Sequence, residues 1–226
     1  MKAMNRILPP TTALALVAIF SFTSGSAQAG LEEGVAAYQA GDLPQAFKEF
    51  SNSAEAGNPY GQFNLALMYE QGIGVTKDET QAVSWYEKSA QQGNSNAQYN
   101  LGVLYENGRG TPVDFAQANQ WYRKAAAQGD ALAVGNLGML YMRGDGVKVD
   151  KNLGLALLIQ SATMDSSPTN NAKKNIAATR GLTTDMITTA QALSNELGQA
   201  QNLLIPLDQY LKTGTTAAGG ESQVAN

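Results

Sequence analysis

Asn64-Leu65-Ala66-Leu67-Met68-Tyr69 recurs 36 residues later as Asn100-Leu101-Gly102-Val103-Leu104-Tyr105, and the same offset leads to Asn136-Leu137-Gly138 and Tyr141. Glycines, alanines and an Asp downstream of each copy keep the same spacing. A fixed period of this size is typical of proteins that stack copies of one supersecondary unit. The sequence therefore predicts a repeat fold.

Each copy has the pattern of two helices joined by a glycine turn. Apolar residues recur at helical spacing in the first half, as at Leu65, Met68 and Tyr69. A Gly-x-Gly then lets the chain leave the helix with positive φ, and an Asp caps the second helix and favours its dipole. The glycine pairs are Gly72/Gly74, Gly108/Gly110 and Gly144/Gly146, and the caps are Asp78, Asp114 and Asp150.

The second helix repeats small and aromatic residues. Ala82, Tyr86 and Ala90 return 36 residues later, and small side chains let paired helices approach closely. Trp85 and its copy Trp121 are expected to pack between helices rather than to form ligand platforms. A recurring Asn in the first helix is expected to bond the backbone of a neighbouring loop or helix; its copies are Asn64, Asn100 and Asn136.

The pattern N-L-(A/G)-x-x-Y-x-x-G-x-G-(V/T)-x-x-D-x-x-x-A-x-x-W-Y-x-K-(A/S)-A-x-x-G resembles the Sel1-like repeat, a relative of the tetratricopeptide repeat. The resemblance covers residues 31–167. It implies an all-α, right-handed solenoid of antiparallel helix pairs, about four repeats long, whose first helices line a concave surface that holds partner proteins. Residues 172–196 also resemble the C-terminal part of exported bacterial members.

The same pattern divides the chain into five parts. Residues 1–29 combine Lys2 and Arg6 with the short apolar run 14–22 and the small-residue site Ala27-Gln28-Ala29, which is typical of a secretory signal peptide. Residues 30–57 form an atypical first repeat whose loop is five residues shorter than in the other copies. The remaining parts are three 36-residue repeats over 58–167, capping helices over 168–212 and a disordered tail over 213–226.

The second helix of the last repeat is apolar on almost every side. Leu158 stands where the other copies have Tyr, and Ile159 stands where they have a charged residue. A helix of this kind must be covered on more than one face. We therefore expect residues 172–204 to fold back over Leu155 and Ile159, with Pro206 ending or bending that helix.

Composition excludes most enzyme chemistry. The chain contains no His and no Cys, so it can form neither a His-based triad, nor a thiol nucleophile, nor a metal site with His or Cys ligands. It also lacks a phosphate-binding glycine loop. We expect no catalytic, cofactor-binding or metal-binding residue, and no enzyme activity.

The charge of the chain further limits the classes of partner that it is expected to bind. Removal of Lys2 and Arg6 lowers the 15 basic side chains to 13 against 19 acidic ones, which gives a net charge of −6. No basic stripe indicates nucleic acid or anionic membrane as a partner, and no second apolar run approaches transmembrane length. We expect a periplasmic or secreted protein after cleavage near Ala29, without stable membrane insertion. A monomer is expected, with end-to-end pairing as the alternative if the C-terminal cap is incomplete.

Positions that vary among the copies are candidates for partner binding, because packing does not fix them. In the first helices they lie on one side, at i, i+3, i+7 and i+10 or i+11. They combine a partly aromatic apolar strip with an acidic edge, which is typical of protein recognition. The predicted partner-binding residues are Tyr60, Phe63, Leu67, Glu70, Tyr99, Val103, Glu106, Met139 and Arg143.

Packing between neighbouring first helices is the alternative interpretation of this strip, and for Phe63 and Tyr99 the two interpretations are balanced. Replacement of both residues by Asp should abolish partner binding and preserve the helical spectrum if they bind a partner. Collapse of the fold would instead place them in the core.

These features lead to two functional hypotheses from different classes. The first is a non-catalytic exported solenoid that binds a protein or peptide and acts as an adaptor or regulator in a bacterial envelope. The second is a carbohydrate- or peptidoglycan-binding module of the periplasm that uses exposed aromatics and carboxylates. Sedimentation with purified cell wall would separate them, because an adaptor for proteins should stay in solution.

Overall fold

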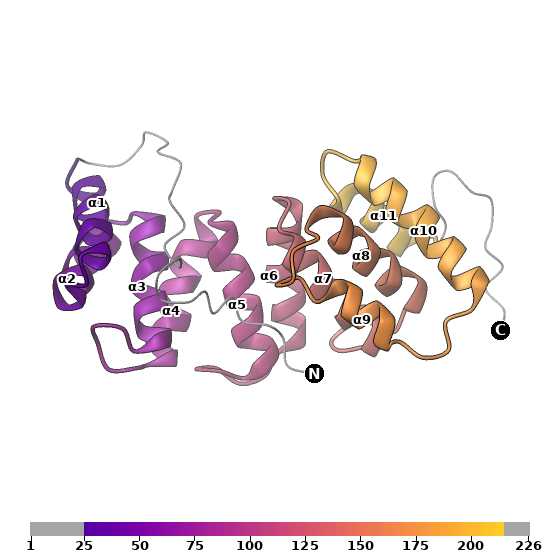
Figure 1. Cartoon of the computed structure of the whole chain (residues 1–226), viewed down its shortest axis with the longest axis horizontal. Coiled ribbons are helices and arrows are strands. Elements are labelled where there is room, and N and C mark those ends of the chain that lie inside the picture. Colours follow the sequence, from indigo (N-terminus) through magenta and orange to yellow (C-terminus); the bar gives the residue numbers. More distant parts are fainter. Residues whose placement is uncertain (1–24, 215–226) are drawn as a thin grey trace. The chain divides into compact units, whose positions relative to one another are not determined.

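The computed structural model describes residues 25–214, which form eleven helices and no strand (Figure 1). Most of the predicted signal peptide and residues 215–226 of the predicted tail lie outside this range. The helices are α1 (Gly25–Gln39), α2 (Leu43–Glu55), α3 (Pro59–Gln71), α4 (Glu79–Gln91), α5 (Ser95–Asn107), α6 (Phe115–Ala127), α7 (Ala131–Arg143), α8 (Lys151–Met164), α9 (Ala172–Ala178), α10 (Thr184–Gln199) and α11 (Leu204–Thr213).

The described helices belong to two compact units. Unit 1 extends to Asp114 and contains α1–α5, and unit 2 begins at Phe115 and contains α6–α11. Within each unit, consecutive helices of the repeats pack on each other and short loops join them, as expected for antiparallel pairs. The predicted all-α solenoid of helix pairs is confirmed. None of the described helices is long and apolar enough to cross a membrane.

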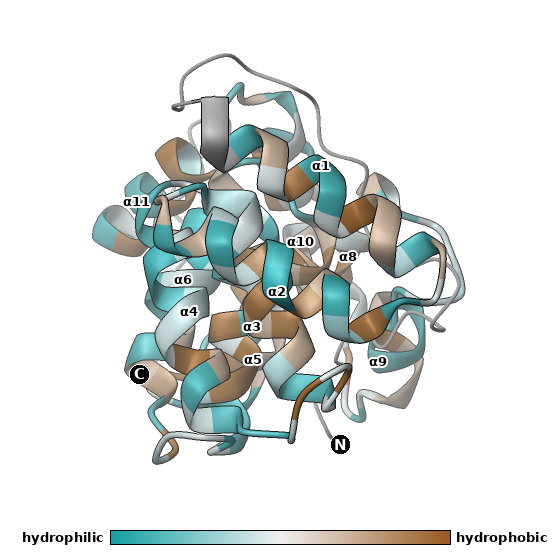
Figure 2. Ribbon diagram, turned by 90° about the vertical axis from the view of Figure 1, so that its left-hand side faces the viewer, coloured by the Kyte–Doolittle hydropathy of each residue, from teal (hydrophilic) through white to brown (hydrophobic). Residues whose placement is uncertain are grey.

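The core of unit 1 begins between the first helix pair and α3. Phe50 is fully buried there with Leu31, Leu65 and Met68, and aromatic residues such as Trp85 pack around this cluster. Figure 2 shows hydrophobic residues concentrated along α3 and α5, whereas α2 presents many hydrophilic ones. Helix α3 thus lies inside unit 1, where the second helices α2 and α4 pack on it.

The Gly-x-Gly turns form as predicted. Gly72, Gly108 and Gly144 end the first helices in the left-handed conformation, with φ of 72°, 65° and 79°. The second glycine has a further role, because a Cβ on Gly110 would lie 2.2 Å from the carbonyl oxygen of Glu79. Each turn therefore presses its backbone against the start of a preceding second helix, and only glycine leaves the room.

Helix starts follow the predicted caps and add others. The Asp78 carboxylate accepts hydrogen bonds from the backbone N–H groups of Thr80 and Gln81, and Asp150 accepts one from Leu153. The first helices have side-chain caps that the sequence analysis did not identify, namely Asn58, Asn94 and Asp130. They satisfy backbone donors that no helical carbonyl can reach.

The predicted C-terminal cap exists in unit 2, although its form differs. Helices α9 and α10 pack against α8, where Leu155 is only 1% exposed and Ile159 is half-buried. Leu193 and Leu197 of α10 are buried with it. The segment contains three helices, and Pro206 lies in the first turn of α11 instead of ending a helix. The prediction for Pro206 was wrong because the first turn of a helix donates no internal backbone hydrogen bond and tolerates proline.

Candidate functional site

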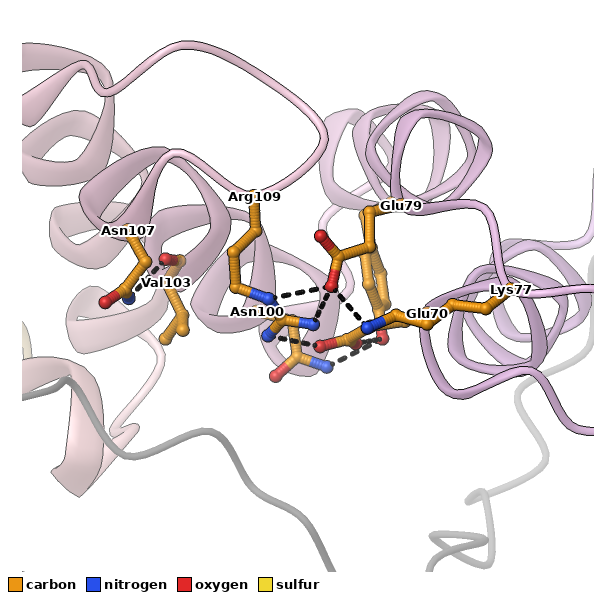
Figure 3. A network of polar contacts seen from close by, with 8 residues as sticks. Glu70, Lys77, Glu79, Asn100, Val103, Asn107 and Arg109 are labelled. Carbon is orange, nitrogen blue, oxygen red and sulfur yellow. Dashed lines mark hydrogen bonds and ion pairs between the residues drawn. The ribbon is translucent and has the colours of Figure 1, made fainter.

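The most connected polar side chains of unit 1 converge on Arg109, which lies in the turn after α5 (Figure 3). Its Nη1 donates to Glu70 Oε1 at 3.0 Å, and its Nε and Nη2 donate to Glu79 Oε1 at 2.9 and 2.5 Å. Lys77 Nζ approaches the same Glu79 oxygen at 2.9 Å. One guanidinium thus joins the end of α3 and the start of α4 to the following repeat.

A buried relay extends this network inward. The Tyr86 hydroxyl donates to Glu70 Oε2 at 2.7 Å and accepts from Asn100 Nδ2 at 3.1 Å. Tyr86 is 0% exposed and Glu70 is 5% exposed. Burial, followed by the charge of Glu70, raises the pKa of Tyr86 well above its ordinary value, so the hydroxyl stays protonated and donating. We call Glu70, Glu79, Tyr86, Asn100 and Arg109 the Arg109 network.

The charges of the network stabilise one another. Burial alone would raise the pKa of Glu79, but hydrogen bonds from Lys77 and Arg109 outweigh it and lower the pKa. Burial alone would lower the pKa of Arg109, but the carboxylates of Glu79 and Glu70 outweigh it and raise the pKa. Both carboxylates therefore accept from cations, and the arrangement suits a structural clamp better than proton transfer.

The network is specific to one step of the solenoid. Glu70 and Tyr86 correspond to Glu106 and Tyr122 in the next copy, and to Met142 and Leu158 in the last. The middle residue of the Gly-x-Gly turn differs in all three copies. It is Ile73 in the first turn, Arg109 in the second and Asp145 in the third. Sequence analysis treated all three turns alike and missed Arg109, although a charge present in one copy alone was a usable signal.

The structure divides the predicted partner-binding residues by exposure. Within unit 1, Phe63 and Leu67 retain 9% and 8% of their surface and Tyr99 and Val103 only 1% each. The Phe63 ring packs on the ring of Tyr86, with 5.8 Å between centroids. The remaining unit 1 positions are Tyr60 and Glu106, which are half-buried, and Glu70, which is in the Arg109 network. In unit 2, Met139 is half-buried and Arg143 is exposed, with Nε 2.8 Å from Asp145.

Burial bears on the two interpretations of the apolar strip. A side chain with 1% exposure, as at Tyr99 and Val103, presents no surface to a partner in this conformation, which favours packing for these two. Tyr60, Glu106, Met139 and Arg143 retain accessible surface within their own units. Partner binding at these positions stays a prediction.

The recurring Asn residues differ from what their spacing predicts. Asn100 bonds the Tyr86 hydroxyl, a side chain, whereas backbone was the expected partner. In unit 2, Nδ2 of Asn136 is buried without a hydrogen-bond partner. The expectation of a backbone partner was therefore wrong for the Nδ2 group of Asn100, because the phenolic oxygen of the neighbouring second helix accepts its hydrogen bond.

The tryptophans pack between helices as expected, and a lysine side chain of the same helix lies over each ring. Trp121 is 8% exposed, and Trp85 packs against the core of unit 1. Lys88 Nζ lies 3.5 Å from the centre of the Trp85 ring, and Lys124 Nζ lies 3.7 Å from that of Trp121. The exposed ring faces thus form cation–π contacts within the chain. Residues 25–214 contain no cluster of three acidic side chains that could hold a metal ion.

Comparison with known proteins identifies the repeat. The profile of the Sel1 repeat matches residues 59–94, 95–130 and 131–166. The crystal structure of a Sel1 repeat protein from Oxalobacter formigenes matches with a TM-score of 0.60 and 28% identity, over 79% of each chain. A protective antigen with an SLR fold from uropathogenic Escherichia coli matches with a TM-score of 0.48 and 28% identity, over 87% of this chain and 49% of that one. A comparison with curated proteins gives no significant match.

Proposed function

Because this chain is a Sel1-like repeat protein, we propose that it is a non-catalytic adaptor or regulator. In this role it binds a protein or peptide in the bacterial envelope. Sel1 repeats are typically protein-interaction modules. The proposal of export rests on the signal-peptide pattern of residues 1–29. The proposed binding surface is the varying side of the first helices, considered in each unit by itself.

The Arg109 network is the observation that best supports a binding scaffold. Its polar groups bond one another across successive helices, so they hold α3, α4 and the turn after α5 in fixed positions. A rigid frame lowers the conformational entropy lost when a partner binds. The half-buried residues beside it, Tyr60 and Glu106, are then presented on fixed helices.

The glycan alternative has less support. Aromatic platforms for sugars need an open ring face, and the two tryptophans have a lysine ammonium over theirs. Co-sedimentation with purified peptidoglycan tests this alternative directly. The proposed adaptor stays in the supernatant, whereas a peptidoglycan-binding module is found in the pellet.

Site-specific photo-crosslinking in the native envelope fraction tests the adaptor proposal. We expect probes at Tyr60 and Glu106 to capture the same discrete protein, and a control probe at Ser84, which is exposed on the second helix α4, to capture none. Equal capture from all three positions, or no protein from Tyr60 and Glu106, would contradict the proposed surface.

A further inference from the structure

The last described helix of unit 2, α11, is attached through few side chains. Leu207 is its one fully buried residue, and Leu203 just before the helix is 7% exposed. Ile205 and Leu211 remain 66% and 44% exposed. The neighbouring helix α10 buries four side chains, so α11 has much less of its surface in the core.

Polar contacts orient α11 on the surface that receives it. The Asp208 carboxylate pairs with Arg123 Nη2 of α6. The Tyr210 hydroxyl hydrogen-bonds Asp150, the residue that caps α8. Burial and this carboxylate raise the pKa of Tyr210 to about 12, which keeps the hydroxyl a donor. A leucine and two polar groups within four consecutive residues thus anchor the helix.

Helix α11 depends on docking for its shape. It has ten residues, and its N-cap residue Leu203 makes no side-chain cap hydrogen bond. Isolated helices of this length are marginal in water, so an undocked α11 would lose its helical structure. Segments that fold on a surface in this way behave as ligands of that surface.

The cation of the receiving surface is present in only one of the repeats. Arg123 stands where the other copies have Glu87 and Ile159. It also lies beside the hydroxyl of Tyr141 on α7, whose pKa is raised by burial and lowered in part by the Arg123 charge. Asp150 adds an acceptor at the start of α8. The surface therefore offers a cation and an anion at separate points, which complement Asp208 and Tyr210.

We propose that the surface formed by Arg123, Tyr141 and Asp150 is a docking site for a partner helix, and that α11 occupies it as an internal ligand. The partner helix carries a leucine, an acidic residue directly after it and a tyrosine two residues further, as in Leu207-Asp208-Gln209-Tyr210. Charge complementarity and the seated α11 both favour this chemistry. None of these three residues is among the predicted partner-binding positions, and neither proposal depends on the other.

A labelled peptide of residues 202–214 is the probe, and the full-length chain is the receptor. Wild-type chain should bind it weakly, because α11 competes for the surface. Asp208→Ala with Tyr210→Phe weakens the internal ligand and retains Leu207 in the core. Binding measured by fluorescence anisotropy should then tighten by at least about ten-fold, since the competent fraction of the receptor rises.

Receptor variants show which surface the peptide uses. In the chain that carries Asp208→Ala and Tyr210→Phe, the further change Arg123→Ala should abolish binding of the peptide. The matched control Lys124→Ala, on the same helix, should leave binding unchanged. A peptide with Asp208→Lys should not bind. The proposal would be overturned if the peptide bound the wild-type chain and the Asp208→Ala, Tyr210→Phe chain with equal affinity while both had the same helicity. Binding that survives Arg123→Ala would also overturn it.

Hydrogen exchange on the wild-type chain gives a second test that needs no variant. If α11 is a displaceable ligand, its amides exchange through local opening, at least about ten-fold faster than those of α8 and α10. Protection of α11 equal to that of α8 would show that it opens only when unit 2 unfolds, and would also overturn the proposal.

Discussion

At the scale of single residues, Arg109 links two helices of unit 1 to the turn that follows α5. Its planar guanidinium donates to two carboxylates on different elements, Glu70 at the end of α3 and Glu79 at the start of α4. A lysine ammonium has no comparable fork and could not hold both in fixed geometry. Glu70 is buried, and its carboxylate accepts hydrogen bonds from both Arg109 and Tyr86.

Arg109→Ala should lower the free energy of unfolding by about 1–3 kcal/mol, because it removes the guanidinium that donates to the buried Glu70 carboxylate. Urea denaturation followed by far-UV circular dichroism measures this change. Arg143→Ala is the matched control, because its contact with Asp145 is more exposed, and it should change stability by less than about 0.5 kcal/mol.

A double variant tests the stated cause. Glu70→Gln removes the negative charge that Arg109 pairs with, so Arg109→Ala should destabilise unit 1 less in that background than in the wild type. Equal costs in both backgrounds would mean that Arg109 stabilises unit 1 through packing of its aliphatic part, and the electrostatic explanation would be wrong.

At the scale of elements, the glycine turns set how closely successive repeats approach. Gly110 and Gly93 both have positive φ, at 67° and 91°. Their surroundings differ, because a Cβ on Gly110 would meet the backbone of Glu79 whereas one on Gly93 would meet nothing within 4 Å. A substitution at Gly93 therefore tests backbone strain alone, whereas one at Gly110 tests backbone strain together with the contact between repeats.

We expect Gly93→Ala to cost about 1 kcal/mol from left-handed strain alone. Gly110→Ala should cost at least about 2 kcal/mol more, since the turn must move away from α4. Urea denaturation of the two variants measures both costs. Similar losses for the two variants would show that the turn relaxes without penalty and that close approach is not required.

The C-terminal cap is the other element whose packing can be tested. Leu197 on α10 is 1% exposed, whereas Ile187 on the same helix is 47% exposed. Leu197→Ala should destabilise unit 2 by about 2–5 kcal/mol through loss of burial and the cavity left behind. Ile187→Ala should change stability by no more than about 0.5 kcal/mol. Thermal unfolding with equal shifts for both variants would contradict the capping role of α10.

At the scale of the whole chain, both units depend on protonated tyrosines. Burial, with further charge effects, raises the pKa of Tyr86 and Tyr141, and it brings that of Tyr105 and Tyr210 to about 12. Above pH 10 the unfolded chain loses these protons while the folded chain keeps them. The unfolded state then binds fewer protons, so stability falls as pH rises.

The free energy of unfolding should therefore be unaffected by these groups below pH 10 and decrease between about pH 10 and 12. Urea midpoints measured across this range test the decrease. Tyr86→Phe removes one contributor, so its stability should fall less steeply with pH than that of the wild type. An identical slope for the two proteins would show that ionisation of Tyr86 is not linked to unfolding.

Much of the fold could be read from the period alone. The 36-residue offset placed three helix pairs, and Gly72 and Asp78 marked a helix end and a helix start that the structure confirms. The apolar second helix of the last repeat predicted a cover, and α10 supplies it. These features are local or strictly periodic, and local backbone preferences are encoded in the residues themselves.

The candidate site was not readable in the same way. Arg109 meets Glu70 across 39 positions of sequence, and Arg123 meets Asp208 across 85. Whether Tyr99 faces a partner or the core was undecided by spacing, because both faces of an inner helix can be apolar.

The sequence by itself therefore determined the repeat, the helix pairs, the turns and the absence of histidine and cysteine chemistry. Only the tertiary structure decided which charges pair, which aromatic residues are buried and where α11 docks. The physical reason is that helix formation depends on neighbours within one or two turns, whereas pairing and burial depend on distances between segments that packing alone brings together.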